Sequence, residues 1–309
     1  MAVESEAVAT LLSKYAAGER NFSAIKLSKV DLSGVDLQGA NFSRATLWEV
    51  NLSQANLVGT NFSQADLSNS SFWDANLRGA NLSQTNCSGA DFCGANLRET
   101  KLDNINFRLA ILNRTDLSNL DLRSINFSKA YLLETNLEGA NLEGANLNHA
   151  FMYQASFNRA ILRGANLSEA DLTSTKLQEA DLTKADFSES DLQGALLTGA
   201  ITVNAIFRLA NLTGLDLSGG NFEGANFSKA VLCGANLQQA KLRRANFWQA
   251  NLSRANLLSA DLTGADLSGV NLEQANLYRA IMPPRWLESV RVCNTTLPDG
   301  NISNRDCGG

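Results

Sequence analysis

The residue types that could perform catalysis are few in this chain and are not arranged for it. Its 309 residues include one histidine, His149, whose serine and aspartate neighbours belong to a polar repeat. A catalytic site needs a nucleophile with a base, paired carboxylates, a metal-ligand set or a phosphate-binding loop. The sequence contains no such pattern and no nucleotide-binding motif. We therefore expect no enzyme activity, no catalytic residue, no cofactor and no small-molecule substrate.

The five cysteines suggest a crosslink more than a metal site. Cys293 and Cys307 flank a Pro-Asp-Gly turn near the C-terminus, so a disulfide between them is one hypothesis. It would close a short loop and stabilise the tail by about 3 kcal/mol in the chain-entropy model. A reducing compartment favours the alternative of two free thiols. Cys87 lies among buried positions and Cys93 and Cys233 among outward ones; without a Cys-x-x-Cys pair we predict no metal site.

A repeat of five residues organises most of the chain. From Phe22 to Met282 every fifth residue is Leu or Phe, except at Cys87, Met152, Thr202 and Met282. We call this the central position. A small residue, usually Ala, stands two places before it, and Asn or Asp usually stands one place before it. Such regularity is typical of a solenoid built by stacking like units.

This spacing fits neither a helix nor a flat strand. Positions five apart drift around an α-helix, and on a strand they alternate between opposite faces. The chain must therefore bend regularly, so that each central residue and the small residue before it point into one shared interior. The remaining three positions of the unit face outward. The sequence predicts an all-β solenoid.

The motif resembles that of the pentapeptide-repeat proteins, in the style of cyanobacterial members with long uninterrupted arrays. Characteristic units are Ala40-Asn41-Phe42-Ser43-Arg44 and Ala265-Asp266-Leu267-Ser268-Gly269. The resemblance implies a right-handed quadrilateral β-helix with four units per coil, so that residues 20 apart stack in columns. We expect an N-terminal helical cap over residues 1–20, the β-helix over 21–282 and a C-terminal cap or tail over 283–309.

Composition places the protein among ordinary soluble chains. The net charge is −5, and we find neither a transmembrane run nor a signal peptide. Residues 4–17 carry an amphipathic stripe (Val8, Leu11, Leu12 and Tyr15) that suits a helix covering the first coil. We expect a cytoplasmic protein without a membrane partner.

Outward positions that depart from the repeat are the candidate functional residues. In 20-residue columns, several apolar side chains fall on one face where Asn, Asp or Ser is usual. Such a group marks a partner site when it is contiguous, or else stabilises neighbouring coils by cross-strand stacking. The candidate partner-binding residues are Trp73, Ile111, Tyr131, Leu133, Phe151 and Tyr153.

Two further departures occur later in the chain. One coil, which holds Thr202 at a central position, has five outward apolar residues: Leu196, Ile201, Val203, Ile206 and Leu209. We expect that coil to be distorted or covered. Acidic residues prevail between Glu134 and Asp191, and five basic residues without an acid lie between Lys229 and Arg254. We interpret both runs as solvated surface.

Three functions remain open. The first is a non-enzymatic scaffold or regulatory protein that binds another protein, with a homodimer as a further form of association. The second, implied by the family resemblance, is a DNA mimic that binds a type II topoisomerase such as gyrase. Weak net charge and the interrupting basic run argue against the mimic, and direct nucleic-acid binding is not expected. A purely structural or stress-related role is a third alternative.

Overall fold

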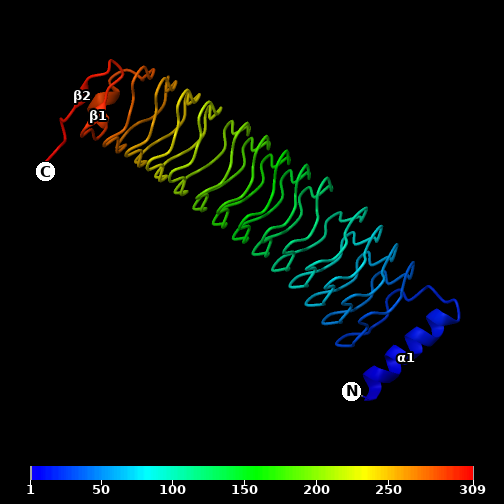
Figure 1. Ribbon diagram of the computed structural model, residues 1–309. Helices are drawn as coiled ribbons and strands as arrows, with labels where there is room; N and C mark the ends of the chain where they lie inside the picture. The colour runs from blue at the N-terminus through cyan, green and yellow to red at the C-terminus, as the bar shows by residue number, and fades with distance from the viewer. Residues whose placement is uncertain (1, 309) are drawn as a thin grey trace. The chain divides into compact units, whose positions relative to one another are not determined.

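The computed structural model describes residues 2–308, with side chains from residue 6 onward, so the outermost predicted boundaries, residues 1 and 309, lie outside it. The chain forms two compact units, residues 1–151 and 152–309, which we describe separately. Within each unit the backbone winds in coils of 20 residues that stack on one another (Figure 1).

Parallel bridges between residues 20 apart hold the coils together. In the first unit, Phe42 N donates to Asn61 O at 2.7 Å, and Asn61 N donates to Ala40 O at 2.9 Å. Asn41 and Asn61 thereby form one bridge of a column that continues coil after coil. In the second unit Val231 and Asn251 form the same parallel bridge. Because the chain turns every five residues, each side of a coil contributes one bridge rather than a long strand.

A β-turn separates each unit of five from the next. The carbonyl of central Leu37 accepts a bond from Ala40 N at 3.1 Å. Gly39, the third residue of this turn, has a φ of 67°. The equivalent position is left-handed throughout the coils, which favours Gly there but also accommodates polar residues such as Gln64, with φ of 61°. Four such turns complete each 20-residue coil.

The interior is filled by the central residues and the small residues before them. Leu37 and Ala40 are both fully buried. Phenylalanines that share a column stack on one another, as in Phe72 and Phe92, whose ring centroids are 4.7 Å apart. Buried threonines satisfy their hydroxyls on the backbone: Thr135 Oγ1 donates to Leu112 O at 2.8 Å. Among the described residues, no buried side-chain nitrogen or oxygen lacks a hydrogen-bond partner.

Helix α1 (Ala2–Ala16) lies at the N-terminal end of the first unit (Figure 1). Leu11 is 2% exposed, and the Tyr15 hydroxyl donates to Gln38 O of the first coil at 2.9 Å. The helix ends where Gly18 adopts a φ of 96°, and the Arg20 guanidinium lies 3.8 Å from the Tyr15 ring centroid.

The C-terminal end of the second unit departs from the repeat after Met282. A short 3-10 helix, η1 (Trp286–Ser289), is followed by strands β1 (Thr295–Thr296) and β2 (Ile302–Ser303), which pair antiparallel. A disulfide joins Cys293 to Cys307 across this hairpin. The Arg305 guanidinium donates to the carbonyls of Leu287 and Val290, and so ties the tail to η1.

The expectation of a covered coil around Thr202 is wrong, whereas that of a distorted coil is confirmed in part, because no parallel bridge joins Leu196 to Asp216 among the described residues. The backbone there keeps the five-residue turn pattern, and Ile201 bridges to Asp181 before it and Asn221 after it. Thr202 fits at the central position because its Oγ1 donates to Asn221 O at 2.7 Å. The apolar neighbours are not covered, since Leu196 and Ile201 are 46% and 47% exposed.

Candidate functional site

The titratable residues of this protein are held in structural hydrogen bonds. Every aspartate or glutamate with a resolved shift has a lowered pKa, as at Asp31, where the Ser33 backbone N–H stabilises the carboxylate. A lowered pKa keeps a carboxylate ionised and unsuited to general-acid work at neutral pH. Burial raises the pKa of the Cys87 and Cys93 thiols, which disfavours the nucleophilic thiolate.

No metal site is apparent in the described part of the chain. Residues 2–308 contain no group of three or more His, Cys, Asp or Glu side chains that could hold an ion. The sole histidine, His149, is half-buried in a left-handed turn position with φ of 55°. Cys293 and Cys307 are joined to each other, and Cys87, Cys93 and Cys233 are free thiols.

The first unit brings most of the candidate binding residues onto one face of its coils. Ile111, Tyr131 and Phe151 occupy successive coils and are joined by parallel bridges. The Tyr131 and Phe151 rings stack with centroids 5.0 Å apart and planes 13° apart. Their exposed fractions are 42% and 47%, while Ile111 is half-buried. Leu133, two residues after Tyr131, is also half-buried. We call these four residues the apolar face.

Three residues of the apolar face stand where the repeat normally has a hydrogen-bonding Asn or Asp. An Asn or Asp before the central residue accepts the N–H two places on, as Asn41 Oδ1 does from Ser43 N at 3.0 Å. Ile, Tyr and Phe cannot accept such a bond. Leu133 N is served instead by Asn113 Oδ1 of the preceding coil, at 2.9 Å. Beside the face, Arg114 pairs with Glu134 at 3.1 Å, giving it a charged edge.

The remaining two predicted residues are described separately. Trp73 is on the same side of the first unit but belongs to an earlier coil, and it is 45% exposed. Its backbone N–H donates a hydrogen bond to Ser71 Oγ at 3.4 Å. Tyr153 belongs to the second unit and is 42% exposed. The apolar face therefore comprises residues of the first unit alone.

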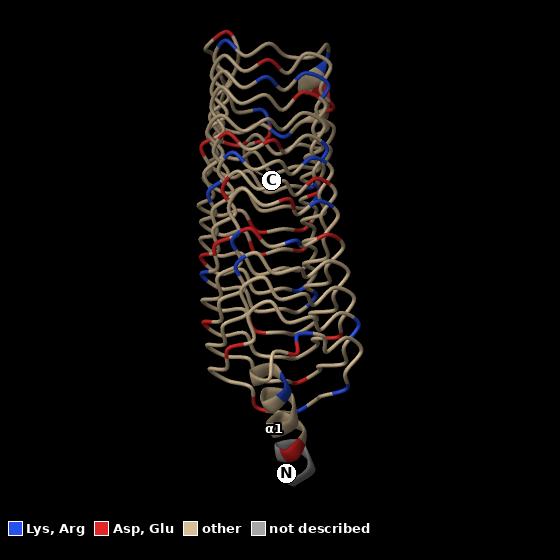
Figure 2. Cartoon of the chain, turned by 90° about the vertical axis from the view of Figure 1, so that its right-hand side faces the viewer, with Lys and Arg blue, Asp and Glu red and all other residues tan. Residues whose placement is uncertain are grey.

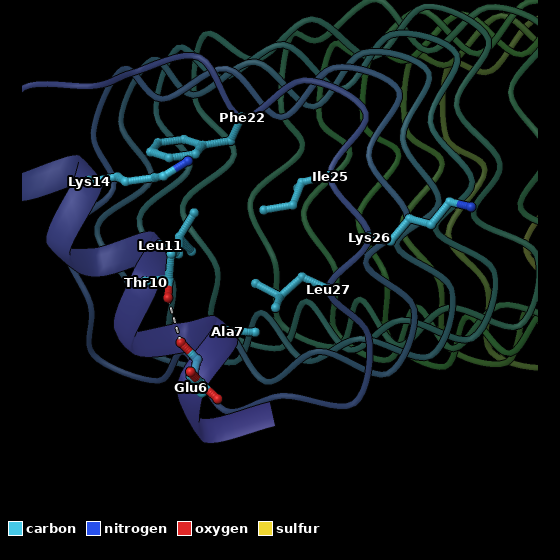
Figure 3. A pocket seen from close by; sticks show the side chains of 9 residues that line it. All are labelled: Glu6, Ala7, Thr10, Leu11, Lys14, Phe22, Ile25, Lys26 and Leu27. Atoms are coloured by element: carbon cyan, nitrogen blue, oxygen red, sulfur yellow. Dashed lines mark hydrogen bonds between the residues drawn. The ribbon is translucent and has the colours of Figure 1, made fainter. Parts of the chain in front are cut away.

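A groove of about 440 Å³ lies between α1 and the first coil. Leu11 of α1 points toward Phe22 and Leu27 of that coil (Figure 3), and Lys14 and Lys26 lie at the edges. Phe22 and Leu27 are 5% and 4% exposed, so the helix already covers most of the apolar surface there. The groove remains because the rounded surface of α1 does not fit closely against the first coil.

Charged residues of both signs are interspersed over the coils (Figure 2). Within the basic run of the second unit, Arg243 pairs with Asp261 at 2.6 Å and Lys229 lies 5.0 Å from the Trp248 ring centroid. Arg254 donates to Gln274 Oε1 at 3.1 Å. Pairing of this kind reduces the field that either a nucleic acid or a topoisomerase would encounter.

Comparison with known families accounts for the repeat. The family model "Pentapeptide repeats (8 copies)" matches overlapping segments that together run from residue 25 to residue 282. The chain belongs to the pentapeptide-repeat family. No curated protein sequence matches it. Within residues 2–308, we find no helix whose length and apolar character would let it cross a bilayer.

Solved structures of other pentapeptide-repeat proteins resemble the chain in sequence. HetL, a protein involved in heterocyst differentiation regulation in the cyanobacterium Nostoc sp. strain PCC 7120, is 31% identical over 95% of this chain and 98% of its own, with a TM-score of 0.23. The alr5209 protein of Nostoc PCC 7120 is 40% identical over 34% of this chain and 79% of its own, with a TM-score of 0.25. Full-length QnrB1, a plasmid-mediated fluoroquinolone resistance protein, is 20% identical over 84% and 96%, with a TM-score of 0.15.

Sequence reasoning did not anticipate a depression at one corner of the second unit, lined by Gly199, Gly219 and Gly220. A signal for it is present at the small inward position. Leu215 and Gly220 occupy consecutive positions of this kind, where Ala is usual. A large residue followed by the smallest one indicates local repacking of the core.

Proposed function

We propose that this pentapeptide-repeat protein is a non-enzymatic interaction protein whose apolar face binds another protein. The observation that carries the proposal is the exposed, stacked pair Tyr131 and Phe151, at positions where the repeat places Asn or Asp. Aromatic side chains flanked by a polar rim are the usual energetic centre of protein interfaces. Half-buried Ile111 and Leu133 extend the pair, and the Arg114–Glu134 ion pair supplies charge at the edge.

Internal stabilisation alone does not account for this face. An aromatic pair contributes about 0.5–1.5 kcal/mol beyond burial. At Tyr131 the backbone bond is kept, because Asn113 Oδ1 accepts from Leu133 N. Replacing an Asn or Asp still forfeits the bond that many coils make to the preceding ladder residue, such as Asn61 Nδ2 to Asn41 Oδ1 at 3.1 Å. A hydrogen bond contributes about 0.5–1.5 kcal/mol net. Three substitutions in one column therefore forfeit at least as much as the ring pair returns.

The topoisomerase mimic receives less support. Its recognition would require dense negative charge, whereas acidic residues here are frequently paired, as in Arg163–Asp181 at 2.5 Å and Arg208–Glu189 at 2.6 Å. No specific observation favours a structural or stress-related role. We accordingly propose a cytoplasmic protein without small-molecule substrate, membrane partner or direct nucleic-acid contact.

We also propose the finer details of the framework from family membership. The coils are taken as right-handed, with the β-helix over residues 21–282. The segments 1–20 and 283–309 then act as caps, since the open end of a solenoid exposes core and unpaired backbone. Contacts at Leu11 and Tyr15 on one side, and at Arg305 on the other, support this assignment.

The test is capture of a partner from lysate of the source organism by three immobilised proteins: wild type, Tyr131→Asn/Phe151→Asn, and Lys101→Asn. Both variants restore the usual residue of the repeat, and Lys101, exposed on another face of the same unit, serves as the control. We expect a partner held by wild type and control and lost by the double variant, with melting temperatures that agree.

Other outcomes would contradict the proposal in recognisable ways. If all three proteins capture the same partners and only the double variant melts lower, the rings are a stabilising ladder. Capture of gyrase subunits by all three would favour the mimic. Light scattering of the same samples distinguishes a homodimer, which the double variant should dissociate if the apolar face mediates it.

A further inference from the structure

A depression of about 410 Å³ marks one corner of two successive coils in the second unit. We call it the corner notch. Its floor is formed by Leu197, Leu217 and Phe222, and its walls by Gly199, Gly219 and Gly220. The volume falls within the range of ligand-binding cavities, which is about 300–1,000 Å³. The notch lies within residues 197–222 and shares no residue with the apolar face.

The notch lies at a corner where glycines leave out side chains and a ring fills the space of one of them. A Cβ on Gly220 would lie 2.4 Å from Phe222 Cε2, so the ring occupies the place that Ala fills elsewhere. Gly199 and Gly219 occupy the left-handed positions of two stacked turns, with φ of 75° and 65°, and the neighbouring turn residues Thr198 and Ser218 also line the notch.

The core is accessible through this opening. Leu197 and Ala200 are 6% and 9% exposed, while Phe207 and Leu212, in neighbouring five-residue repeats, are 0% exposed. The lining on the first coil includes the apolar Ile201, which is 47% exposed, and Leu196, 46% exposed, directly precedes the lining residue Leu197. An apolar side chain entering the notch would therefore contact Leu197, Ala200 and Ile201.

The rim on the following coil is polar and has unused hydrogen-bonding capacity. Asn221 bridges to Ile201, which offers no side-chain acceptor. Its Oδ1 accepts Glu223 N at 3.3 Å, but its Nδ2 donates no hydrogen bond within the described residues. At the other side, Asp216 Oδ1 accepts Ser218 N at 3.1 Å and Asn236 Nδ2 at 2.9 Å. A carboxylate has about four acceptor sites, so capacity remains.

We propose that the corner notch binds a polypeptide segment of a partner through one apolar side chain and its backbone amides. The side chain enters the notch beside Ile201. A backbone carbonyl of the segment accepts from Asn221 Nδ2, and a backbone N–H donates to the Asp216 carboxylate. An apolar floor flanked by one donor and one acceptor is the pattern that a peptide complements.

The proposal is tested on the intact protein with N-acetyl-leucine methylamide, which carries an apolar side chain between two amides. Its binding is followed by the ¹H–¹⁵N signals of Gly199, Gly219 and Gly220. 4-Methyl-1-pentanol supplies a similar apolar group without an amide. We expect saturable shifts with the leucine amide and weaker binding of the alcohol.

Two variants locate the site. Leu196→Asn/Ile201→Asn restores the usual residues of the repeat and gives Asn221 an acceptor on the preceding coil. We expect the dissociation constant of the leucine amide to rise about tenfold, the equivalent of one or two weak contacts. Val231→Asn, an equivalent change at an exposed position of the same unit, should leave it unchanged.

Three results would overturn the proposal: shifts that do not saturate, equal binding of the amide and the alcohol, or equal binding by all variants. Concentration-dependent shifts of the same glycines in the free protein would instead indicate that a second copy of this chain occupies the notch. Because these variants leave the apolar face unchanged, failure here leaves the proposed function untouched.

Discussion

At the scale of single residues, the side chain before each central position determines how well a coil is joined to the next. Asn51 shows the general case: its Oδ1 accepts Ser53 N at 3.1 Å, and its Nδ2 donates to Asp31 Oδ1 at 2.9 Å. Where Ile, Tyr or Phe replaces it, those bonds are lost and an apolar surface is gained. The candidate surfaces of this protein are therefore places where the ladder is interrupted.

Gly220→Ala provides a residue-scale test, because sequence and structure predict opposite results. Alanine is the usual residue at that position of the repeat, so the pattern alone predicts a neutral or stabilising change. The structure places the new Cβ 2.4 Å from Phe222 Cε2 and 3.1 Å from Leu217 O. We expect destabilisation of about 1–3 kcal/mol, as for other overpacked cores, measured as a lower urea midpoint.

Gly214→Ala is the matched control for that measurement. Gly214 has a φ of 70°, and a methyl group added there would have no heavy atom within 4 Å. Its substitution therefore costs only the left-handed backbone, about 1 kcal/mol. If Gly220→Ala is no more harmful than this control, the Phe222 ring moves freely and the account of the notch is wrong.

At the scale of elements, the C-terminal tail is held by one arginine, one aspartate and one disulfide. Arg305 Nη2 pairs with Asp306 Oδ2 at 2.7 Å, and the same carboxylate accepts Val292 N at 2.9 Å. Because β1 and β2 contain two residues each, their ladder is too short to hold the tail unaided.

Acid should release this tail. The hydrogen bond from Arg305, followed by that from Val292 N, lowers the pKa of Asp306 from an ordinary 3.8 to about 2. A depressed carboxyl pKa stabilises the folded form above the ordinary value, and this contribution is lost as the pH falls through the folded pKa. We expect the Val292 amide signal to be constant above pH 4 and to change between about pH 4 and 2.

Asp306→Asn is the control for the acid titration. The variant should show the released tail at every pH, with no transition between about pH 4 and 2. A wild-type Val292 signal that does not respond to acid in this range would mean that Asp306 does not hold the tail.

The disulfide is the second element-scale prediction. Joining residues 14 apart in the sequence, it should stabilise the tail by about 3 kcal/mol in the chain-entropy model. Cys293→Ser should accelerate hydrogen exchange in Thr295–Ser303 while leaving the coils protected. Peptide mapping without reductant that recovers both thiols free in the purified protein would contradict the bond.

At the scale of the whole molecule, charge rather than shape gives the clearest expectation. The net charge is −5 and the isoelectric point is near 5.1. Solubility should be lowest near that pH, because repulsion between copies is then smallest. Turbidity measured across about pH 4–8 tests this. A minimum well away from the isoelectric point that moves with Tyr131→Asn/Phe151→Asn would show that the apolar face governs association instead.

The sequence by itself determined the repeat, its inward and outward positions, and the columns of residues 20 apart. It could do so because a five-residue period has few physical solutions, and Leu, Ala and Asn each suit one environment. The column of Ile111, Tyr131 and Phe151 was therefore predictable, as was the burial of Cys87. Family membership then follows from the same motif.

Only the tertiary structure decided what happens where the repeat is imperfect. The partly distorted coil at Thr202, the Phe222 ring in the space of a missing side chain and the notch beside Gly220 each depend on how side chains from different coils share space. The five-residue period predicts whether a side chain points inward or outward, but it does not predict which side chains it contacts. The physical reason is that packing depends on neighbours 20 residues away, and a volume lost at one position can be taken up by a ring from another.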